Sequence, residues 1–376
     1  MGRGDNEEAH YTLGNSFIML IIIALILTVF FRRFAEPLLM AFGASENTIG
    51  YAMDYMRIYT LGTIFVQFAL GLNAFITAQG FAKISMATVV IGAVINIVLD
   101  PIFIFGFHMG VKGAALATII SQAVSAIWVL RFLTGKKTIL KLQKKYFRLC
   151  GSVVGPCLLL GMSPFIMQAT ESAISVCFNS SLYRYGSDIA VGAMSILTSI
   201  MQFSMLPLQG FTQGAQPITG YNFGAGNADR VRQTFRLLLR YCLTYSLILW
   251  AICMAVPRLI PSMFTGDEQL LTYTAWALRH YMALSGIFGI QIACQQTFIA
   301  IGNAKTSLFL AVYRKIILLI PLIYILPAIL EQKDRAVFLA EPVADFIAVT
   351  TTAIMFAYQF KNAMKKLEAG KKPAEA

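Results

Sequence analysis

Long apolar stretches alternate with short polar connections along the whole chain. Ten of them exceed about 18 residues, so each is long enough to cross a bilayer as an α-helix. They lie at residues 10–31, 47–79, 84–107, 111–133, 148–184, 188–222, 230–256, 269–301, 306–330 and 336–360. The pattern predicts an all-α polytopic membrane protein with about ten transmembrane helices.

The sequence repeats itself without a gap at an offset of 222 positions. The recurring pairs are Gly2/Gly224, Gly4/Gly226, Phe42/Phe264, Glu46/Glu268, Tyr51/Tyr273, Arg57/Arg279, Tyr59/Tyr281, Gly80/Gly302, Ala82/Ala304, Lys83/Lys305 and Ser85/Ser307. Residues 147–223 precede the second copy and have no counterpart ahead of the first. We therefore interpret the chain as two copies of a six-helix unit, the first lacking two helices, roughly 75 residues.

Two explanations of the shorter first copy are open. Either Met1 is an internal start within a protein about 75 residues longer, or the chain is a true truncation. The first explanation is favoured, because deleting two helices exposes polar groups and packing surface to lipid.

A basic stretch separates the two copies. Residues 1–134 are expected to form a truncated amino-terminal lobe of four helices, and residues 148–364 a carboxy-terminal lobe of six. A basic cytoplasmic linker at 135–147 joins them, and a cytoplasmic tail follows at 365–376. Parallel repeats related by a pseudo-twofold axis along the membrane normal are a recurring plan of secondary transporters, which handle substrate between the halves.

The composition excludes a soluble globule: 57% of residues are hydrophobic, 13% are charged, and the mean hydropathy is +0.69. The net charge of +12 does not indicate nucleic-acid binding, because the basic residues are segregated by side. Nineteen of the 30 lysines and arginines fall on the side of both termini, seven on the other side and four within spans. By the positive-inside rule both termini are cytoplasmic, in a multi-pass protein of the cell (inner) membrane. The six cysteines lie within or beside apolar spans without a CxxC spacing, which predicts small core residues.

Asp100 is the strongest candidate for a functional residue in the first half. It lies in an otherwise apolar run, where an ionisable side chain is expensive, with Asn96 four residues earlier on the same helical face. Pro101 has no N–H to donate to the carbonyl of Ile97, which leaves a backbone oxygen beside the two side chains. One carboxylate with amide and carbonyl oxygens forms a candidate Na⁺ site or a protonatable site. The alternative is an aspartate at a helix end that reaches the interface.

Three more polar residues are candidates for the same cation site: Asn73 and Tyr55 in the second span and Thr118 in the fourth. Each adds an oxygen if its helix packs against Asp100. Singly, such residues more often form hydrogen bonds between membrane helices.

In the second half, Glu171 is the only acidic residue of the span 148–184, and Gln168 and Asn179 flank it. A membrane-embedded glutamate can neutralise a cationic substrate or carry a proton, and structural pairing is the alternative. Gln291 and Gln295 make the span 269–301 rich in amides, which suits contacts with a ligand or helix packing. We take these residues as the candidate substrate site.

Two basic residues, Arg314 and Lys315, lie deep in the span 306–330 and need an acidic partner or a water-filled seam. Glu171 and Asp345 are candidate partners, and the sequence does not choose between them. Asp345 and Glu341 begin the last span close to the outer face, where site and surface roles are equally open.

The segment 209–227 is rich in glycine and amides. Pro217 is expected to break the helix near the cytoplasmic boundary, and Gly220 and Gly224 allow close backbone approach. A hinge between two conformations and simple dense packing both account for these residues.

Several longer motifs carry a resemblance to a known family. They are QGFTQGAQPITGYNFGAGNADRVR at 209–232, NIVLDPIFIFG at 96–106, GVKGAALATIISQ at 110–122, and the repeated pair AQGFAK at 78–83 and AIGNAK at 300–305. Together they resemble the multidrug and toxic compound extrusion (MATE) family of cation-coupled exporters, over essentially the whole chain. The resemblance implies two pseudo-twofold-related lobes that export organic cations and other amphipaths against inward Na⁺ or H⁺.

The resemblance also assigns residues. It maps the amino-lobe cation site onto Asn73, Asn96, Asp100 and Thr118, with Tyr55 close by, and Glu171 onto a membrane-embedded acid of the carboxy lobe. It implies no cofactor beyond the coupling ion, and small amphipathic or cationic substrates and the lipid bilayer as partners, in a monomer. The chain departs from the family where the first helix usually contributes an acid to the site of Asp100, and where glutamines in 269–301 replace an aspartate.

Other functional classes agree less well with the sequence. A flippase for lipid-linked oligosaccharides needs a large cationic cavity, for which Arg314 and Lys315 do not suffice. The Gly2–Asp5 sequence fits the GxGD pattern of membrane aspartyl proteases but lies outside any apolar span, and HExxH and GxSxG motifs are missing, so we expect no enzyme. An inactive truncated remnant is the last alternative.

Overall fold

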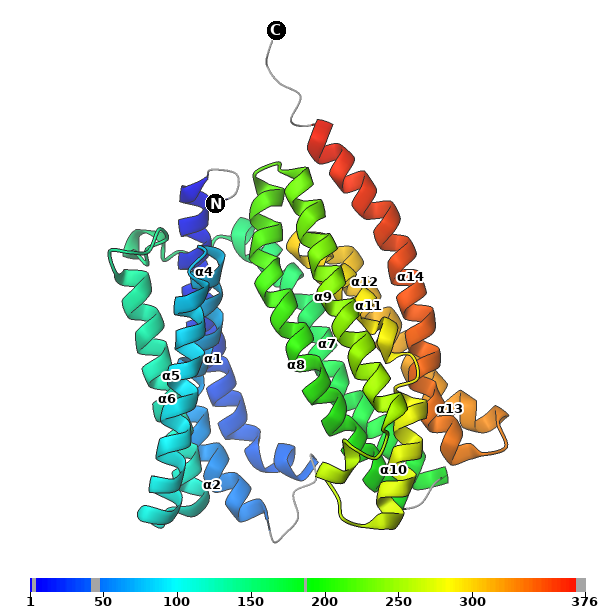
Figure 1. Ribbon diagram of the computed structural model, residues 1–376. Helices are drawn as coiled ribbons and strands as arrows, with labels where there is room; N and C mark the ends of the chain where they lie inside the picture. The colour runs from blue at the N-terminus through cyan, green and yellow to red at the C-terminus, as the bar shows by residue number, and fades with distance from the viewer. Residues whose placement is uncertain (2–4, 42–47, 186–187, 370–376) are drawn as a thin grey trace. The chain divides into compact units, whose positions relative to one another are not determined.

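The computed structural model describes residues 1, 5–41, 48–185 and 188–369, and every regular element among them is helical (Figure 1). Nine helices in these ranges are long and apolar enough to cross a membrane, and a bent pair of shorter helices supplies a tenth span. The predicted all-α chain of about ten spans is confirmed. The repeat partners at positions 2, 4, 42 and 46, the GxGD glycines and the tail end at 370–376 lie outside the described residues.

The chain divides into two compact units, unit 1 ending at Pro156 and unit 2 beginning at Cys157. The division falls inside a single helix, Gly151–Tyr185 (α7). The lobe and linker boundaries drawn from the sequence, at 134, 147 and 364, stay a prediction.

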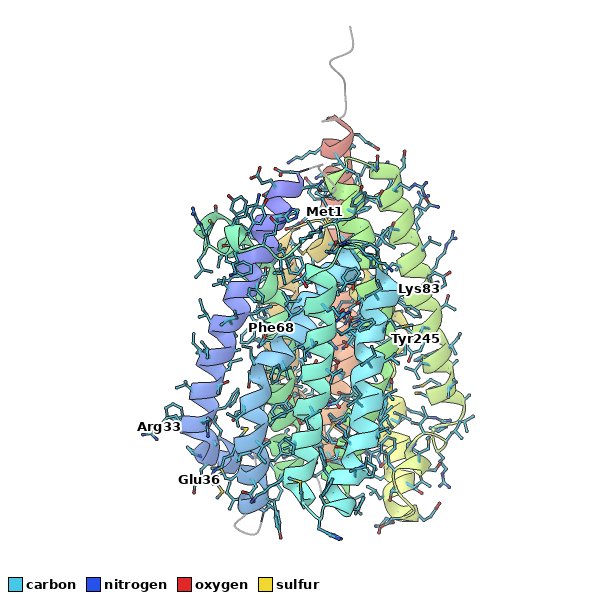
Figure 2. The ribbon with its side chains drawn as sticks, turned by 90° about the vertical axis from the view of Figure 1, so that its left-hand side faces the viewer. Met1, Arg33, Glu36, Phe68, Lys83 and Tyr245 are labelled. Carbon is cyan, nitrogen blue, oxygen red and sulfur yellow. The ribbon has the colours of Figure 1, made fainter. Side chains whose placement is uncertain are left out.

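Unit 1 is built from α1 to α6, which pack side by side (Figure 1). The bounds are α1 Asn6–Ala41, α2 Ile49–Tyr59, η1 Thr60–Gly62, α3 Thr63–Gln67, η2 Phe68–Leu72, α4 Asn73–Ala78, α5 Ala82–Pro101, η3 Ile102–Gly106, α6 Gly110–Thr134 and η4 Lys144–Tyr146. Fully buried side chains from α1, η2, α4 and α6 form its core, among them Leu13, Leu72, Ile76, Val129 and Leu133. Figure 2 shows Met1 and Lys83 toward one end of these helices and Arg33 and Glu36 at the other, as expected if successive connections alternate between two sides.

Unit 2 contains the remaining helices. The bounds are α7 Gly151–Tyr185, α8 Asp188–Gly224, α9 Ala228–Ala255, η5 Pro261–Met263, α10 Glu268–Tyr281, α11 Ser285–Ala300, α12 Ala304–Val312, η6 Tyr313–Leu319, α13 Ile320–Ile329 and α14 Lys333–Ala369. Phe178 of α7, Leu278 of α10 and Phe338 of α14 meet in its largest core cluster. Gly289 lets α11 approach α9 closely, because a Cβ there would lie 2.5 Å from the carbonyl oxygen of Cys242. All six cysteines are free; Cys242, Cys253 and Cys294 are buried, as the prediction of core residues requires, whereas Cys150, Cys157 and Cys177 are half-buried.

The sequence repeat corresponds to a repeated joint between helices. The Asn73 amide donates to the carbonyl of Ser85 at 3.2 Å, and at the 222-position offset the Gln295 amide donates to the carbonyl of Ser307 at 3.3 Å. In both joints a turn with a left-handed glycine lies between the two bonded residues, Gly80 at φ +88° in the first copy and Gly302 at φ +80° in the second. The amide and the glycine therefore belong to the scaffold that the two copies share.

A break in one span recurs as well. α10 and α11 meet at a bend of 50° after Tyr281. In unit 1 the corresponding Tyr59 is followed by a 3₁₀ turn, Thr60–Gly62, within a span that stays continuous. The two copies therefore interrupt the same helix to different degrees.

The predicted helix break at Pro217 is wrong. α8 continues through Pro217 and ends at Gly224, after which Gly226 has φ +71°. Proline is tolerated inside membrane helices when neighbouring groups satisfy the freed carbonyl. Gly220 lies against α11, since a Cβ there would be 3.2 Å from the carbonyl oxygen of Ala300, which favours the packing interpretation over the hinge.

The basic connection after α6 is tied to unit 1 by one amide. The Gln79 side-chain oxygen accepts hydrogen bonds from Thr138 Oγ1 at 2.8 Å and from the backbone N–H groups of Ile139 at 2.8 Å and Leu140 at 2.9 Å. Gln79 and Thr138 are both buried. The lysine-rich connection is thus a fixed part of unit 1.

We expect Gln79→Leu to release this connection. The substitution removes three hydrogen bonds to one buried oxygen. The free energy required to open the connection locally should therefore fall by about 2 kcal/mol, which raises the population of the open form roughly 30-fold. Tryptic cleavage at Lys136 and Lys137 then accelerates by a similar factor. Gln332→Leu, at an exposed position in unit 2, is the matched control and should leave the cleavage rate unchanged. Equal cleavage of Gln79→Leu and the unaltered protein would contradict the tether.

Candidate functional site

In unit 1 the structure brings Asn96 and Asp100 together at the carboxyl end of α5. The Asn96 amide nitrogen donates to Asp100 Oδ1 at 3.2 Å, and both side chains are half-buried. α5 ends at Pro101, and the wider π turn η3 follows directly. The predicted i, i+4 pairing is therefore present, at a local irregularity of the span.

The amide orientation bears on which cation this pair suits. As placed, Asn96 acts as a hydrogen-bond donor to the carboxylate, whereas a Na⁺ ligand presents its amide oxygen, which requires the amide to flip. No group of three or more metal-ligating His, Cys, Asp or Glu side chains occurs among the described residues. The arrangement as it stands holds an aspartate that can bind a proton or one monovalent cation beside an amide.

The other predicted members of this site lie apart from Asp100 or bond elsewhere. Asn73 bonds to Ser85, which is 15 residues before Asp100 on α5, or roughly 22 Å along a helix. Thr118 donates to the carbonyl of Ala114 in its own helix at 2.9 Å. Tyr55 stacks on Tyr59, with ring centroids 5.6 Å apart. The structure brings together Asn96 and Asp100 of the five predicted residues, and a cation-binding role of all five stays a prediction.

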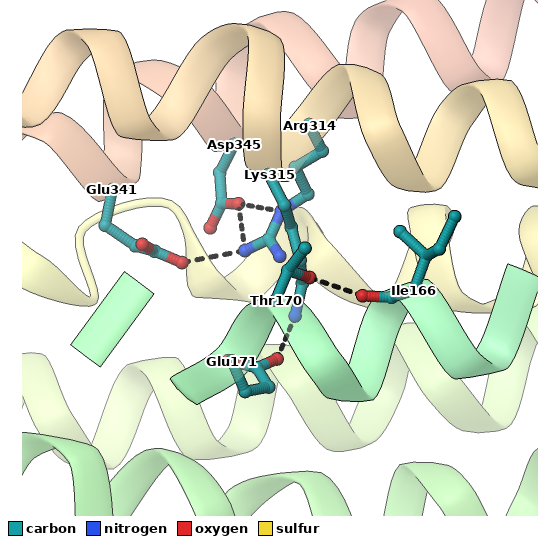
Figure 3. A network of polar contacts seen from close by, with 7 residues as sticks. All are labelled: Ile166, Thr170, Glu171, Arg314, Lys315, Glu341 and Asp345. Atoms are coloured by element: carbon teal, nitrogen blue, oxygen red, sulfur yellow. Dashed lines mark hydrogen bonds and ion pairs between the residues drawn. The ribbon is translucent and has the colours of Figure 1, made fainter. Parts of the chain in front are cut away.

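Unit 2 contains a buried cluster of charges (Figure 3). Arg314, in the π segment η6, points toward two acids of α14, with its guanidinium 2.7 Å from Asp345 Oδ1 and 2.7 Å from Glu341 Oε1. All three side chains are at most 8% exposed. The guanidinium also lies over the ring of Phe288, 4.6 Å from its centroid, a favourable cation–π geometry.

The neighbouring Lys315 points the other way, toward α7, and its ammonium pairs with Glu171 (Figure 3). Lys315 is 5% exposed and Glu171 is 62% exposed, so the lysine is buried while its partner remains accessible. The sequence left the partners of the two basic residues open. The structure assigns Glu171 to Lys315, and Asp345 with Glu341 to Arg314.

The remaining predicted substrate residues are distributed around unit 2. Gln168 is exposed one turn before Glu171, and Asn179 is half-buried two turns after it. Gln291 and Gln295 are buried on α11; the Gln295 amide supports the repeated joint, and the Gln291 side-chain oxygen has no hydrogen-bond partner. Gln168 and Glu171 lie on one face of α7, whereas the glutamines of α11 are part of the interior.

The charged cluster is specific to the second copy. At the 222-position offset, Arg314 and Lys315 correspond to Gly92 and Ala93, and Glu341 to Ile119. Asp100 likewise corresponds to an apolar residue, Leu322. The shared amide joint holds helices together in both copies, whereas Asp100, Arg314, Lys315 and Glu341 have no ionisable counterpart in the other copy. The sequence leaves the roles of Glu341 and Asp345 open, because a charge near the end of a span is equally compatible with a position at the surface.

An all-helical chain of about ten apolar spans, with ionisable side chains inside several of them, has the form of a multi-pass membrane transporter. A sequence model of the MatE family matches residues 1–102 and 164–325. The chain therefore belongs to the MatE family, and the predicted resemblance to MATE transporters is confirmed.

Relatives and solved structures agree with this assignment. The chain is 27% identical over 355 residues to the multidrug export protein MepA of Staphylococcus haemolyticus, covering 93% of this chain and 77% of that protein. It is 23% identical over 329 residues to MepA of Staphylococcus aureus, covering 88% and 72%. The solved structure of the MATE multidrug transporter DinF-BH superimposes with a TM-score of 0.88 at 35% identity, covering 97% of this chain and 81% of that one. A MATE structure in the bent conformation gives a TM-score of 0.91 at 22% identity, over 98% and 82%, a similarity of fold.

Proposed function

We propose that this protein is a secondary active multidrug exporter, which moves amphipathic or cationic organic compounds out of the cell by alternating access in exchange for Na⁺ or H⁺. The names of its relatives, multidrug export proteins and a multidrug transporter, support the substrate class. We place it in the cell membrane with both termini in the cytoplasm, following the distribution of basic residues, and expect it to act as a monomer.

The observation that carries the coupling proposal is the Asn96–Asp100 pair. An aspartate inside an apolar span costs several kcal/mol, and a cation or proton at the carboxylate reduces that cost. Occupancy of Asp100 therefore changes the relative free energy of conformations that bury the carboxylate differently, and a substrate that prefers one conformation uses the bias.

The exposed carboxylate of Glu171 is our candidate contact for the positive charge of a substrate, with Gln168 and Asn179 on the same helix. An organic cation at Glu171 competes with the ammonium of Lys315 for the carboxylate. A substrate of the same shape without the charge lacks this attraction and should bind Glu171 more weakly. Gln291 and Gln295 offer amide groups to less polar parts of a ligand.

Expression in a bacterium that lacks its own efflux pumps tests the function directly. We expect cells producing the protein to retain less of several fluorescent cationic dyes than cells with an empty vector. Equal retention of every dye, with the protein present in the membrane, would contradict the proposal.

We expect Glu171→Gln to weaken export of cationic substrates several-fold more than export of neutral ones, because only the cations lose an attractive charge. The measurement is the initial efflux rate for a matched pair of dyes. Glu331→Gln, an exposed glutamate in the connection before α14, is the control. The double variant Glu171→Gln/Lys315→Met removes the stranded ammonium as well and separates substrate contact from stability. Equal loss for both dyes would indicate a structural role.

A further inference from the structure

The charges that meet at Arg314 do not balance. Arg314 is one cation between two carboxylates, those of Glu341 and Asp345, and these three side chains are almost fully buried. The adjacent Lys315 is directed at Glu171, which is 62% exposed, and this pair adds no net charge to the three. A net charge in the interior is strongly unfavourable, so the cluster has room for one more positive charge.

The geometry indicates which atom lacks a partner. Arg314 Nε donates to Asp345 Oδ1 at 2.8 Å, and the terminal nitrogen Nη2 reaches both Asp345 Oδ1 and Glu341 Oε1. The second oxygen of Glu341, Oε2, is buried and has no hydrogen-bond partner. An ionised carboxylate normally accepts hydrogen bonds at both oxygens, so a bare buried oxygen is much more costly when it carries charge.

We propose that Glu341 binds a proton at Oε2, so that the Arg314–Glu341–Asp345 triad is a proton site of unit 2, separate from the Asn96–Asp100 pair. The proposal rests on the proposed function only where the proton is coupled to export. A proton neutralises the excess charge at the atom that lacks a partner. A metal ion fits poorly, because the guanidinium already lies within 2.7 Å of both carboxylates and repels a second cation.

Charged and titratable groups around Glu341 come from several helices. Arg314 and Lys315 of η6, Asp345 of α14 itself and Glu171 of α7 act on it electrostatically, and it acts in turn on the hydroxyl of Tyr281 in α10. Two further helices pack on α14 and carry no charged residue: α13 contains Tyr324 and α11 contains Cys294.

Protonation of Glu341 changes the electrostatic attraction on η6, the segment that carries Arg314. Neutral Glu341 still accepts a hydrogen bond from Arg314 at Oε1 but no longer attracts it ionically, so Asp345 is left as the ionic partner of the guanidinium within the triad. Arg314 lies in the π-helical turns of η6, a wide form of helix that often marks functional positions. In the first copy the corresponding Gly92 lies in the regular helix α5 and carries no charge. The proton site and the π segment therefore occur together in the second copy.

Infrared difference spectroscopy of the purified protein between acidic and alkaline buffer tests the site without any transport. We expect a C=O band of a protonated, buried carboxyl group, equivalent to one group per chain, that disappears in Glu341→Gln. The band should persist in Asp100→Asn and in Glu36→Gln, an exposed glutamate of α1. Because glutamine resembles the protonated acid, Glu341→Gln should keep the thermal stability of the protein at low pH. A band that survives in Glu341→Gln, the absence of any such band, or loss of the band on adding Na⁺ alone at constant pH would overturn the proposal.

A transport measurement separates this site from the function. In vesicles with an imposed pH gradient, Glu341→Gln should lose on the order of tenfold in the gradient-driven rate, about 1.4 kcal/mol. If the carboxyl band is assigned to Glu341 but the protein exports no substrate, the proposed function is refuted and the proton site is still supported. If the protein exports substrate but no carboxyl band depends on Glu341, the proton site is refuted and the proposed function is not.

Discussion

Asp100→Asn is expected to lower ion-driven export on the order of tenfold or more while the protein still reaches the membrane. Asparagine keeps the shape and the contact with Asn96 but removes the charge that attracts the driving cation. A loss of about 1.4 kcal/mol in the free energy that biases the two conformations already gives a factor of ten. The measurement is the initial rate of dye efflux in vesicles energised by an imposed Na⁺ or H⁺ gradient.

Asp54→Asn is the matched control for this experiment. It makes the same chemical change in unit 1, but Asp54 is 38% exposed and pairs with Lys112 at 3.4 Å, an arrangement that contributes little energy at a surface. We expect its efflux rate to match that of the unaltered protein. Undiminished efflux in Asp100→Asn would remove Asp100 from the mechanism.

The second large effect is expected for Arg314→Met, which should destabilise the protein by about 3–5 kcal/mol. Methionine fills a similar volume but leaves the carboxylates of Glu341 and Asp345 buried without their shared cation. Thermal unfolding of the solubilised protein should occur at a clearly lower temperature, and the loss should diminish in acidic buffer, where the acids take up protons.

Two further variants make the test specific. The triple variant Arg314→Met/Glu341→Gln/Asp345→Asn removes every charge of the triad and should recover most of the stability. Arg335→Met removes an arginine that stacks on Trp276 in unit 2 at 4.8 Å and should cost much less. An Arg314→Met protein as stable as the unaltered one would show that the triad is not the buried network described here.

The spans and the repeat could be predicted because they depend on patterns that are local or periodic. Within the part of the chain that the structure describes, the ten apolar runs correspond to nine continuous spans and the bent α10–α11 pair. The 222-position offset even anticipates a shared hydrogen bond, although Asn73 became a glutamine at position 295 in the second copy. The pairing of Asn96 with Asp100 followed from helical spacing alone.

Partner choice between helices could not be predicted in the same way. Which acid meets Arg314 depends on the packing of η6 against α14 and α7, and a single sequence does not encode that distance in any local pattern. Adjacent residues on a helix point in different directions, so Arg314 and Lys315 reach different helices. For the same reason Asn73 was grouped with Asp100, although it bonds near the opposite end of α5. The helix break at Pro217 failed because membrane helices tolerate proline better than soluble ones do.

The most direct test of cation-coupled export uses purified protein in proteoliposomes loaded with a fluorescent cationic dye. Gradients of Na⁺ and of H⁺ are imposed one at a time, and each is then dissipated by a selective ionophore. We expect one of the two gradients to accelerate dye efflux on the order of tenfold. The ionophore for that gradient should abolish the acceleration, and Asp100→Asn should not show it. Efflux that continues at the same rate with both gradients dissipated would contradict cation-coupled export.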